Sequence, residues 1–174
     1  MKNIILTTTA ILSFTLGFAQ TNFKWEKIDS ISKTKAQIYS DTKMFIAEYW
    51  KSAQNVIQND DKEAGMILVK GLSSKDIFFL LNAHNYTYSY TVKFLMKEGK
   101  YKLIIENVNC VSATCNGTIK WPLVEPTENT SESIGGVPSK RLAEIMVSLK
   151  TDLQSIVDSY EKYIKTPSSS NGDW

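Results

Sequence analysis

The residues of this chain that could do chemistry are few and scattered. His84 is the only histidine, and Cys110 and Cys115 are the only cysteines. One imidazole without a serine or cysteine placed beside it does not make a nucleophile–base pair. The sequence also lacks a glycine-rich phosphate loop, a Gly-x-Ser-x-Gly elbow and a metalloprotease helix motif. We therefore expect no enzyme activity, no catalytic residue and no cofactor.

Acidic residues gather at one place, in the run Asp60-Asp61-Lys62-Glu63. Calcium needs about six to eight oxygen ligands at spaced positions, and the EF-hand spacing is absent. The cysteines and histidine are too few for a zinc site. A solvated hairpin turn is therefore the better interpretation of this run, and we expect no metal.

The first 19 residues have the features of a signal peptide. Lys2 gives a positive start, Ile4 to Phe18 form a short apolar stretch, and Gly17 and Ala19 place small residues before a cleavage site at Gln20. We expect an exported product, periplasmic or extracellular, with no integral membrane segment after cleavage. In an exported chain, two nearby cysteines favour a disulfide, here Cys110–Cys115.

Composition indicates an ordinary globular protein, with 43% hydrophobic and 22% charged residues. Twenty basic and eighteen acidic residues leave a net charge of only +2, and Arg141 is the only arginine. That charge is too weak to favour nucleic acid as a partner. We expect a single domain over residues 20–166 and a disordered tail over 167–174.

Apolar spacing predicts the order of the elements. Helical spacing is seen from Lys35 to Ala53 and again after Pro138 as far as Ile164. Strand patterns cover 23–31, 56–60, 66–72, 86–97 and 100–109. Residues 73–85 fit either a strand extension or a tucked loop. The order β-α-β-β-β-β-α predicts an α+β domain, an antiparallel sheet with both helices packed on one face.

The register of the last hairpin follows from its turn. Glu98-Gly99 forms a two-residue turn, so Lys97 pairs with Lys100. Phe94 then lies opposite Leu103, and the apolar side chains of both strands share one face. Continued along the strands, this register predicts Asn107 opposite Tyr90 and Asn109 opposite Tyr88.

Several segments of the chain resemble a known family. They are the helix ending in Trp50, the segment 56–65, Lys70-Gly71 and the hairpin 97–101, while the leader ending Phe-Ala-Gln resembles those of Bacteroidetes. The family is an exported one of unknown function with a TBP-like fold, and the resemblance covers about Ser30 to Asn109. It implies the same β-α-β4-α order and brings no catalytic residue. Residues 73–85 depart from the family pattern, which has a more compact link there.

The best candidate binding site lies at one end of the long hairpin. Its inward face carries tyrosines where the other end carries aliphatic side chains, and the predicted register adds two amides: Tyr86, Tyr88, Tyr90, Asn107 and Asn109. Aromatic faces with polar groups are typical of small-molecule and sugar sites. Alternatively, the tyrosines only cap the core with their hydroxyls in solvent.

Three classes of function remain open. The first is a non-catalytic module of the cell envelope that binds a small molecule, a glycan or an envelope protein. The second is a structural or assembly protein of the envelope. The third is an enzyme of unrecognised type. The first interpretation fits the lack of catalytic motifs and the candidate site best.

Overall fold

The computed structural model describes residues 24–79, 82–112 and 139–166. Their elements follow in the order β1 (Lys24–Ser30), α1 (Lys35–Trp50), α2 (Ala53–Val56), β2 (Ile57–Asp61), β3 (Met66–Phe79), β4 (Asn82–Lys97), β5 (Lys100–Cys110) and α3 (Ser139–Lys165). The signal peptide predicted over 1–19 and the tail predicted over 167–174 lie outside the described residues, so those boundaries stay predictions.

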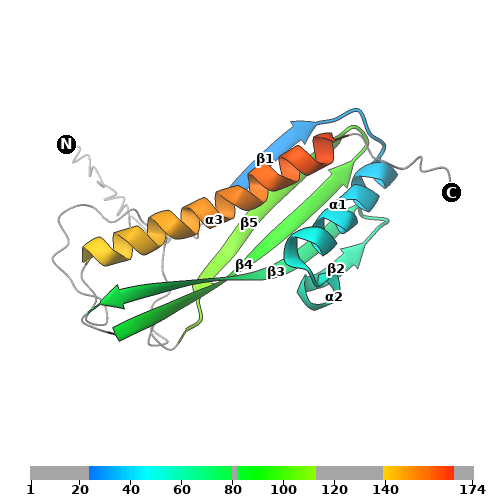
Figure 1. Cartoon of the computed structure of the whole chain (residues 1–174). Coiled ribbons are helices and arrows are strands. Elements are labelled where there is room, and N and C mark those ends of the chain that lie inside the picture. Colours follow the sequence, from blue (N-terminus) through cyan, green and yellow to red (C-terminus); the bar gives the residue numbers. More distant parts are fainter. Residues whose placement is uncertain (1–23, 80–81, 113–138, 167–174) are drawn as a thin grey trace, which may run out of the picture.

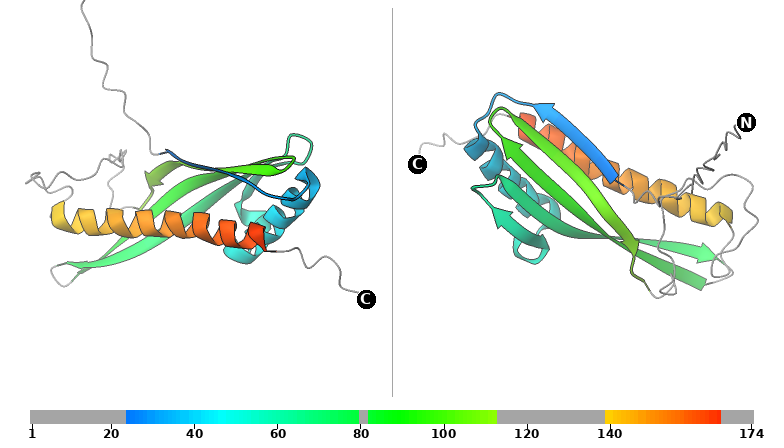
Figure 2. Two further views of the ribbon diagram at one scale, coloured as in Figure 1. Left: turned by 90° about the horizontal axis from the view of Figure 1, so that it is seen from above. Right: turned by 180° about the vertical axis from the view of Figure 1, so that it is seen from behind.

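The strands form one antiparallel sheet in the order β1-β5-β4-β3-β2. Both long helices lie on the same side of it, α3 along the strands and α1 across one end (Figures 1 and 2). The predicted α+β fold, with its helices on one face of an antiparallel sheet, is confirmed. Among the described residues, no helix is both long and apolar enough to cross a membrane.

The segment left open between strand and loop is strand as far as the structure describes it. β3 is 14 residues long and β4 is 16, and they pair from Met66↔Leu95 to Phe79↔Asn82. These two strands therefore extend past the rest of the sheet as a two-stranded arm, visible at the lower left of Figure 1.

Helix α1 begins and ends through specific backbone features. Thr34 and Gln37 form a capping box, in which each side chain bonds the other residue's backbone N–H. The helix was predicted to run to Ala53, but it ends at Trp50 because Lys51 adopts a left-handed conformation with φ 56°. The chain then turns through the short helix α2 into β2.

The hairpin register predicted near the turn is confirmed. Lys97 pairs with Lys100, and Phe94 with Leu103. Gly99 has φ 68°, a conformation that glycine adopts without the strain a side chain would cause. The apolar side chains of both strands face the helices and are buried.

The core is centred on Tyr160 of α3, which is fully buried. Its ring lies 4.9–5.1 Å from the ring centroids of Phe45, Phe94 and Tyr101, so it contacts α1, β4 and β5 at once. Its hydroxyl lies 2.8 Å from Oγ1 of Thr42 on α1. Since the Thr42 hydroxyl donates to the carbonyl of Ile38 at 2.6 Å, Tyr160 is the donor to Thr42.

We predict unequal costs for removing the two ends of this hydrogen bond. Thr42→Val leaves the Tyr160 hydroxyl buried without an acceptor and should lower the free energy of unfolding by about 1–3 kcal/mol. Tyr160→Phe leaves Thr42 bonded to Ile38 and should cost about 0.5–1.5 kcal/mol. The double variant should cost less than the sum, as measured by urea unfolding. Strictly additive costs would show that the bond does not couple the two helices.

Candidate binding site

The three tyrosines of the predicted site lie on the inward face of β4. Tyr86, Tyr88 and Tyr90 are only 3%, 2% and 5% exposed, because α3 lies over this face of the arm. The site was expected to be partly open to water at this point. Instead, the row belongs to the core, and Tyr90 also lines a pocket.

The two asparagines are not brought to the tyrosines, because the predicted register fails beyond Thr91. A β-bulge at Asn107, which has φ 56°, shifts the pairing so that Ser89 faces Asn109 and Tyr88 faces Cys110. Both asparagines are exposed, and Val108 is buried in their place. The expected pairs Tyr90–Asn107 and Tyr88–Asn109 are therefore wrong.

The remaining chemistry-bearing residues of the sequence do not gather at this site. Cys110 ends β5 and pairs in register with Tyr88, whereas Cys115 lies outside the described residues, so the disulfide stays a prediction. His84 pairs in register with Ile77 near the tip of the arm. Asp60 accepts hydrogen bonds from Tyr39 and Lys43 and so ties β2 to α1.

Tyr90 is positioned by Gly71, its neighbour on β3. A Cβ at position 71 would lie 2.4 Å from the Tyr90 ring, closer than any real contact allows. The missing side chain thus lets the ring lie across β3, and its hydroxyl oxygen is 2.6 Å from the same point. Glycine is therefore needed within this strand because the Tyr90 ring approaches so closely; it is not needed to form a turn.

Beyond Tyr90 lies a pocket of about 360 Å³ where α1, α3 and β3 meet. We call it the aromatic pocket. It is lined by three aromatic, three aliphatic and four polar or charged residues: Tyr49, Trp50 and Tyr90; Leu72, Leu153 and Ile156; Lys51, Ser73, Asp152 and Ser155. The sequence analysis identified only Tyr90 of this set. The one signal in the sequence is the pair Tyr49-Trp50 at the end of a helix, and such a pair by itself does not distinguish a pocket from core packing.

Most polar groups of the aromatic pocket are held by one another. Ser73 donates to Asp152 at 2.7 Å, and Lys75 forms an ion pair with the other carboxylate oxygen at 3.4 Å. Tyr49 lies 3.1 Å from the Ser155 hydroxyl, which donates to the Asp152 carbonyl. The polar wall is thus preorganised, and the Asp152 charge is partly balanced.

Trp50 is the exception. Its indole N–H is buried and has no hydrogen-bond partner among the described residues. Burial raises the pKa of Tyr90, and the nearby Trp50 indole opposes that rise. The indole N–H thus makes a weak polar contact with the Tyr90 hydroxyl, which falls short of a well-formed hydrogen bond. A donor in this position is available to an acceptor that enters the pocket.

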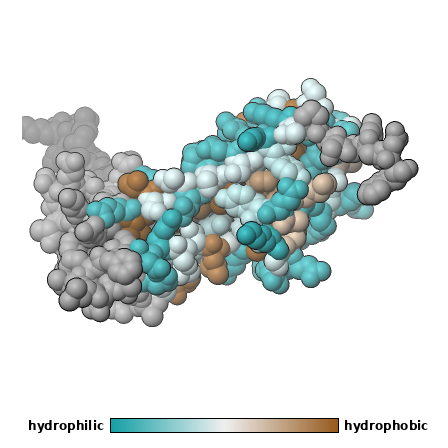
Figure 3. Space-filling model, in the orientation of Figure 1, coloured by the Kyte–Doolittle hydropathy of each residue, from teal (hydrophilic) through white to brown (hydrophobic). Residues whose placement is uncertain are grey.

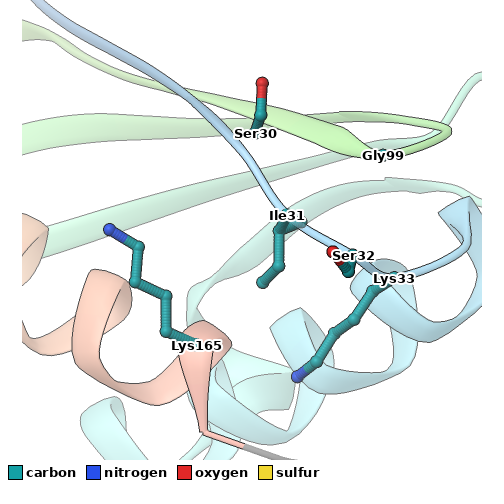
Figure 4. Close-up of a pocket in the computed structure, with 6 residues that line it drawn as sticks. All are labelled: Ser30, Ile31, Ser32, Lys33, Gly99 and Lys165. Atoms are coloured by element: carbon teal, nitrogen blue, oxygen red, sulfur yellow. The ribbon is translucent and has the colours of Figure 1, made fainter.

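A second hollow, of about 730 Å³, lies at the opposite end of the sheet and is lined by Ser30 to Lys33, Gly99 and Lys165 (Figure 4). Both of its lysines, Lys33 and Lys165, already have partners within the domain. Lys33 donates to Asp41 at 2.8 Å and to the carbonyls of Ile164 and Thr166 at 2.7 and 2.9 Å, and so satisfies the end of α3. Lys165 pairs with Asp29 at 2.7 Å. This hollow is therefore a structural junction.

The outer face of the sheet carries lysines that are balanced by carboxylates. Lys93 pairs with Glu106, and Lys24 and Lys102 both pair with Glu26. The hydrogen bond from Lys24, followed by the one from Lys102, lowers the pKa of Glu26 to about 2. No group of three or more potential metal ligands occurs within the described parts of the chain.

The sheet, its two helices and the aromatic pocket define an α+β domain of TBP-like fold. Residues 25–110 match the family model described as "Domain of unknown function (DUF4468) with TBP-like fold", so this part of the chain is a domain of that family. The resemblance found in the sequence is therefore confirmed. No curated protein matches this sequence.

Two solved structures share the fold. A DUF4468 family protein from Bacteroides ovatus is 17% identical, with a TM-score of 0.55 over 85% of this chain and 89% of that one. A TBP-like protein from Parabacteroides distasonis is 12% identical, with a TM-score of 0.52 over 80% of this chain and 93% of that one. At such identities the likeness shows the fold alone.

The contact between Gly71 and Tyr90 predicts a conditional effect of one methyl group. Gly71→Ala should lower the free energy of unfolding by about 1–3 kcal/mol, because the Tyr90 ring has to leave its place. In a Tyr90→Val background the same change should cost little or even stabilise, since alanine suits a strand better than glycine. Urea unfolding of the four chains measures this coupling. Equal costs in both backgrounds would contradict the assigned contact.

Buried tyrosines also predict a loss of stability in alkaline solution. Burial first, and then Asp60, raises the pKa of Tyr39 to about 12, and burial raises the pKa of Tyr88 and Tyr160 as well. Their contribution is fully present below the unfolded pKa of about 10 and is lost as the pH rises through the folded values. Lysine ion pairs also weaken over this pH range. The absorbance of phenolate therefore distinguishes deprotonation of the buried tyrosines from the loss of those ion pairs. Phenolate should appear together with unfolding, and Tyr39→Phe should reduce the pH dependence.

Proposed function

We propose that this chain is an exported, non-catalytic binding module of the bacterial cell envelope, and that the aromatic pocket holds its ligand or partner. The leader-like first 19 residues support export, to the periplasm or the exterior. The size of the pocket, about 360 Å³, lies within the range of sites that take a small ligand or a partner's side chain.

The observation that carries the proposal is the unpartnered Trp50 indole N–H. A buried donor without an acceptor costs about 1–3 kcal/mol. The hydroxyls of Tyr88 and Tyr101 are also buried without a partner, but of the three groups only Trp50 lines the aromatic pocket. A ligand oxygen that accepts from Trp50 would recover this free energy on binding. The Tyr90 hydroxyl and the Asp152 carboxylate offer further polar contacts beside it.

The lining of the pocket supports a non-catalytic role. It includes no histidine and no cysteine, and its one carboxylate is held by Ser73 and Lys75. A group that is fixed by two partners serves better to orient a ligand than to exchange protons with it.

The surface favours binding at the pocket over assembly through a broad apolar face. Among the described residues, the large exposed apolar side chains are separated along the chain: Ile28, Met44, Leu72, Val111 and Val147. On the face shown in Figure 3, hydrophobic areas are small and lie between hydrophilic ones. Scattered apolar residues of this kind are normal on a monomer.

An envelope pull-down tests the proposal. The tagged chain, produced from its own leader, should be found in the periplasmic or extracellular fraction and should retain a specific component from solubilised envelopes. Trp50→Phe keeps an aromatic ring but removes the donor, so it should retain much less of that component. Ile28→Ser, far from the pocket on β1, is the matched control and should retain as much as the unchanged chain. Equal retention by both variants would refute binding at the pocket.

A further inference from the structure

Beside the aromatic pocket, one edge of the sheet has no pairing partner among the described residues. β2 pairs with β3 only from Met66 to Val69, and residues 51–56 then run beside the start of the uncovered edge. From Ser73 to Phe79, no described strand and no described backbone hydrogen bond occupies the outer side of β3. We call this stretch the open edge. It forms the border of the arm seen in Figure 1.

The side chains along the open edge do not cover its backbone. On the inward face, Ser73 donates a hydrogen bond to Asp152 of α3, and Lys75 forms an ion pair with the same carboxylate. Ser74 bonds Thr87 at 2.9 Å and Asp76 accepts from Asn85 at 2.8 Å, both across the pair with β4. Proteins usually protect a long edge with prolines, bulges or side chains that deter pairing. Of these devices, the stretch from Ser73 to Asp76 has only two charged side chains, Lys75 and Asp76, and each is held by a partner within the domain, Asp152 or Asn85.

The open edge and the aromatic pocket meet at one point. Leu72 and Ser73 belong to the lining of the pocket, and the open edge starts at Ser73. Leu72 is 65% exposed, the highest value among the large apolar side chains described. A chain lying along the edge would therefore pass over the mouth of the pocket.

We propose that the open edge binds an extended polypeptide segment of a partner protein as an added strand, with one of its side chains in the aromatic pocket. This inference rests on the proposed function and names the class of ligand. In such recognition, main-chain hydrogen bonds supply affinity and an adjoining pocket supplies the choice of side chain. Here β3 offers the main-chain groups, and the pocket offers aromatic walls with one free donor.

The pocket also defines the side chain that it accepts. Its walls are aromatic and apolar, the Trp50 indole needs an acceptor, and the Asp152 charge is opposed by Lys75. These features favour an uncharged side chain with an apolar stem and an oxygen at its tip, such as tyrosine or glutamine.

A display library of random linear peptides, selected on the purified full chain, tests this inference. We expect selected peptides to share an extended, alternating pattern with tyrosine or glutamine at one fixed position. A synthetic copy should slow amide hydrogen exchange in β3 from Ser73 onward. Trp50→Phe should weaken its binding about tenfold or more, and Ile28→Ser should leave it unchanged.

Two adjacent serines allow a direct test of the edge. The N–H groups of neighbouring residues in a strand point to opposite sides of the strand. One of the variants Ser73→Pro and Ser74→Pro therefore removes a backbone hydrogen bond to β4. The other leaves that pairing in place and blocks the side of β3 that faces away from β4. The variant that keeps its stability should lose peptide binding. If both variants unfold, amide hydrogen exchange in β3 of the unchanged chain, with and without the peptide, still tests whether the peptide binds at the edge.

Several outcomes would overturn the inference. They are the selection of no peptide, peptide binding without protection of β3, and full binding by the stable proline variant. A dimer formed through β3, or a glycan that fills the pocket without protecting β3, would equally reject a peptide partner. If the envelope component is still lost with Trp50→Phe in these cases, binding at the pocket survives and only the class of ligand is wrong.

Discussion

Tyr160 has to be buried where α1, α3 and the sheet meet, and its hydroxyl has to be satisfied there. Thr42 provides the acceptor because its own hydroxyl proton is already donated to Ile38 in the preceding turn of α1. This chain of two hydrogen bonds sets the position of α3 against α1, since the buried Tyr160 hydroxyl needs Thr42 as its acceptor. The rings of Phe45, Phe94 and Tyr101 then close around Tyr160. The helical layer is thus attached to the sheet at one aromatic centre.

From that centre, α3 runs along the arm of β3 and β4 and covers its inward face. The inward face of the arm carries tyrosines, which fill the wide space beneath a single helix but also bring hydroxyls into the core. Tyr88 keeps its hydroxyl buried without a partner. Tyr90 differs from Tyr88 because its ring lies across Gly71, so that Tyr90 lines the aromatic pocket. The pocket is therefore a consequence of how the arm is packed.

Sequence patterns predicted the element order, the face of the helices and the hairpin register up to Thr91, because alternation leaves only one register that buries both apolar sets. They did not predict the bulge, since nothing in Glu106-Asn107-Val108 indicates that this asparagine will take φ 56°. The long arm stayed undecided because residues 73–85 alternate poorly. The pocket could not be found at all, because its lining comes from α1, β3, β4 and α3 and depends on a ring lying over a glycine.

Local rules of stability fail at several places in this domain, and two of them are neighbours. Trp50 buries a donor without a well-formed hydrogen bond, and β3 has a stretch of backbone groups that no described residue pairs. Either feature alone weakens a fold or invites aggregation, and simple substitutions would remove both: phenylalanine at the first, a proline or a bulge at the second. Natural domains tend to break such rules where they function. Because one added strand could satisfy the unpaired backbone and bring an acceptor to Trp50, the two exceptions have a common explanation.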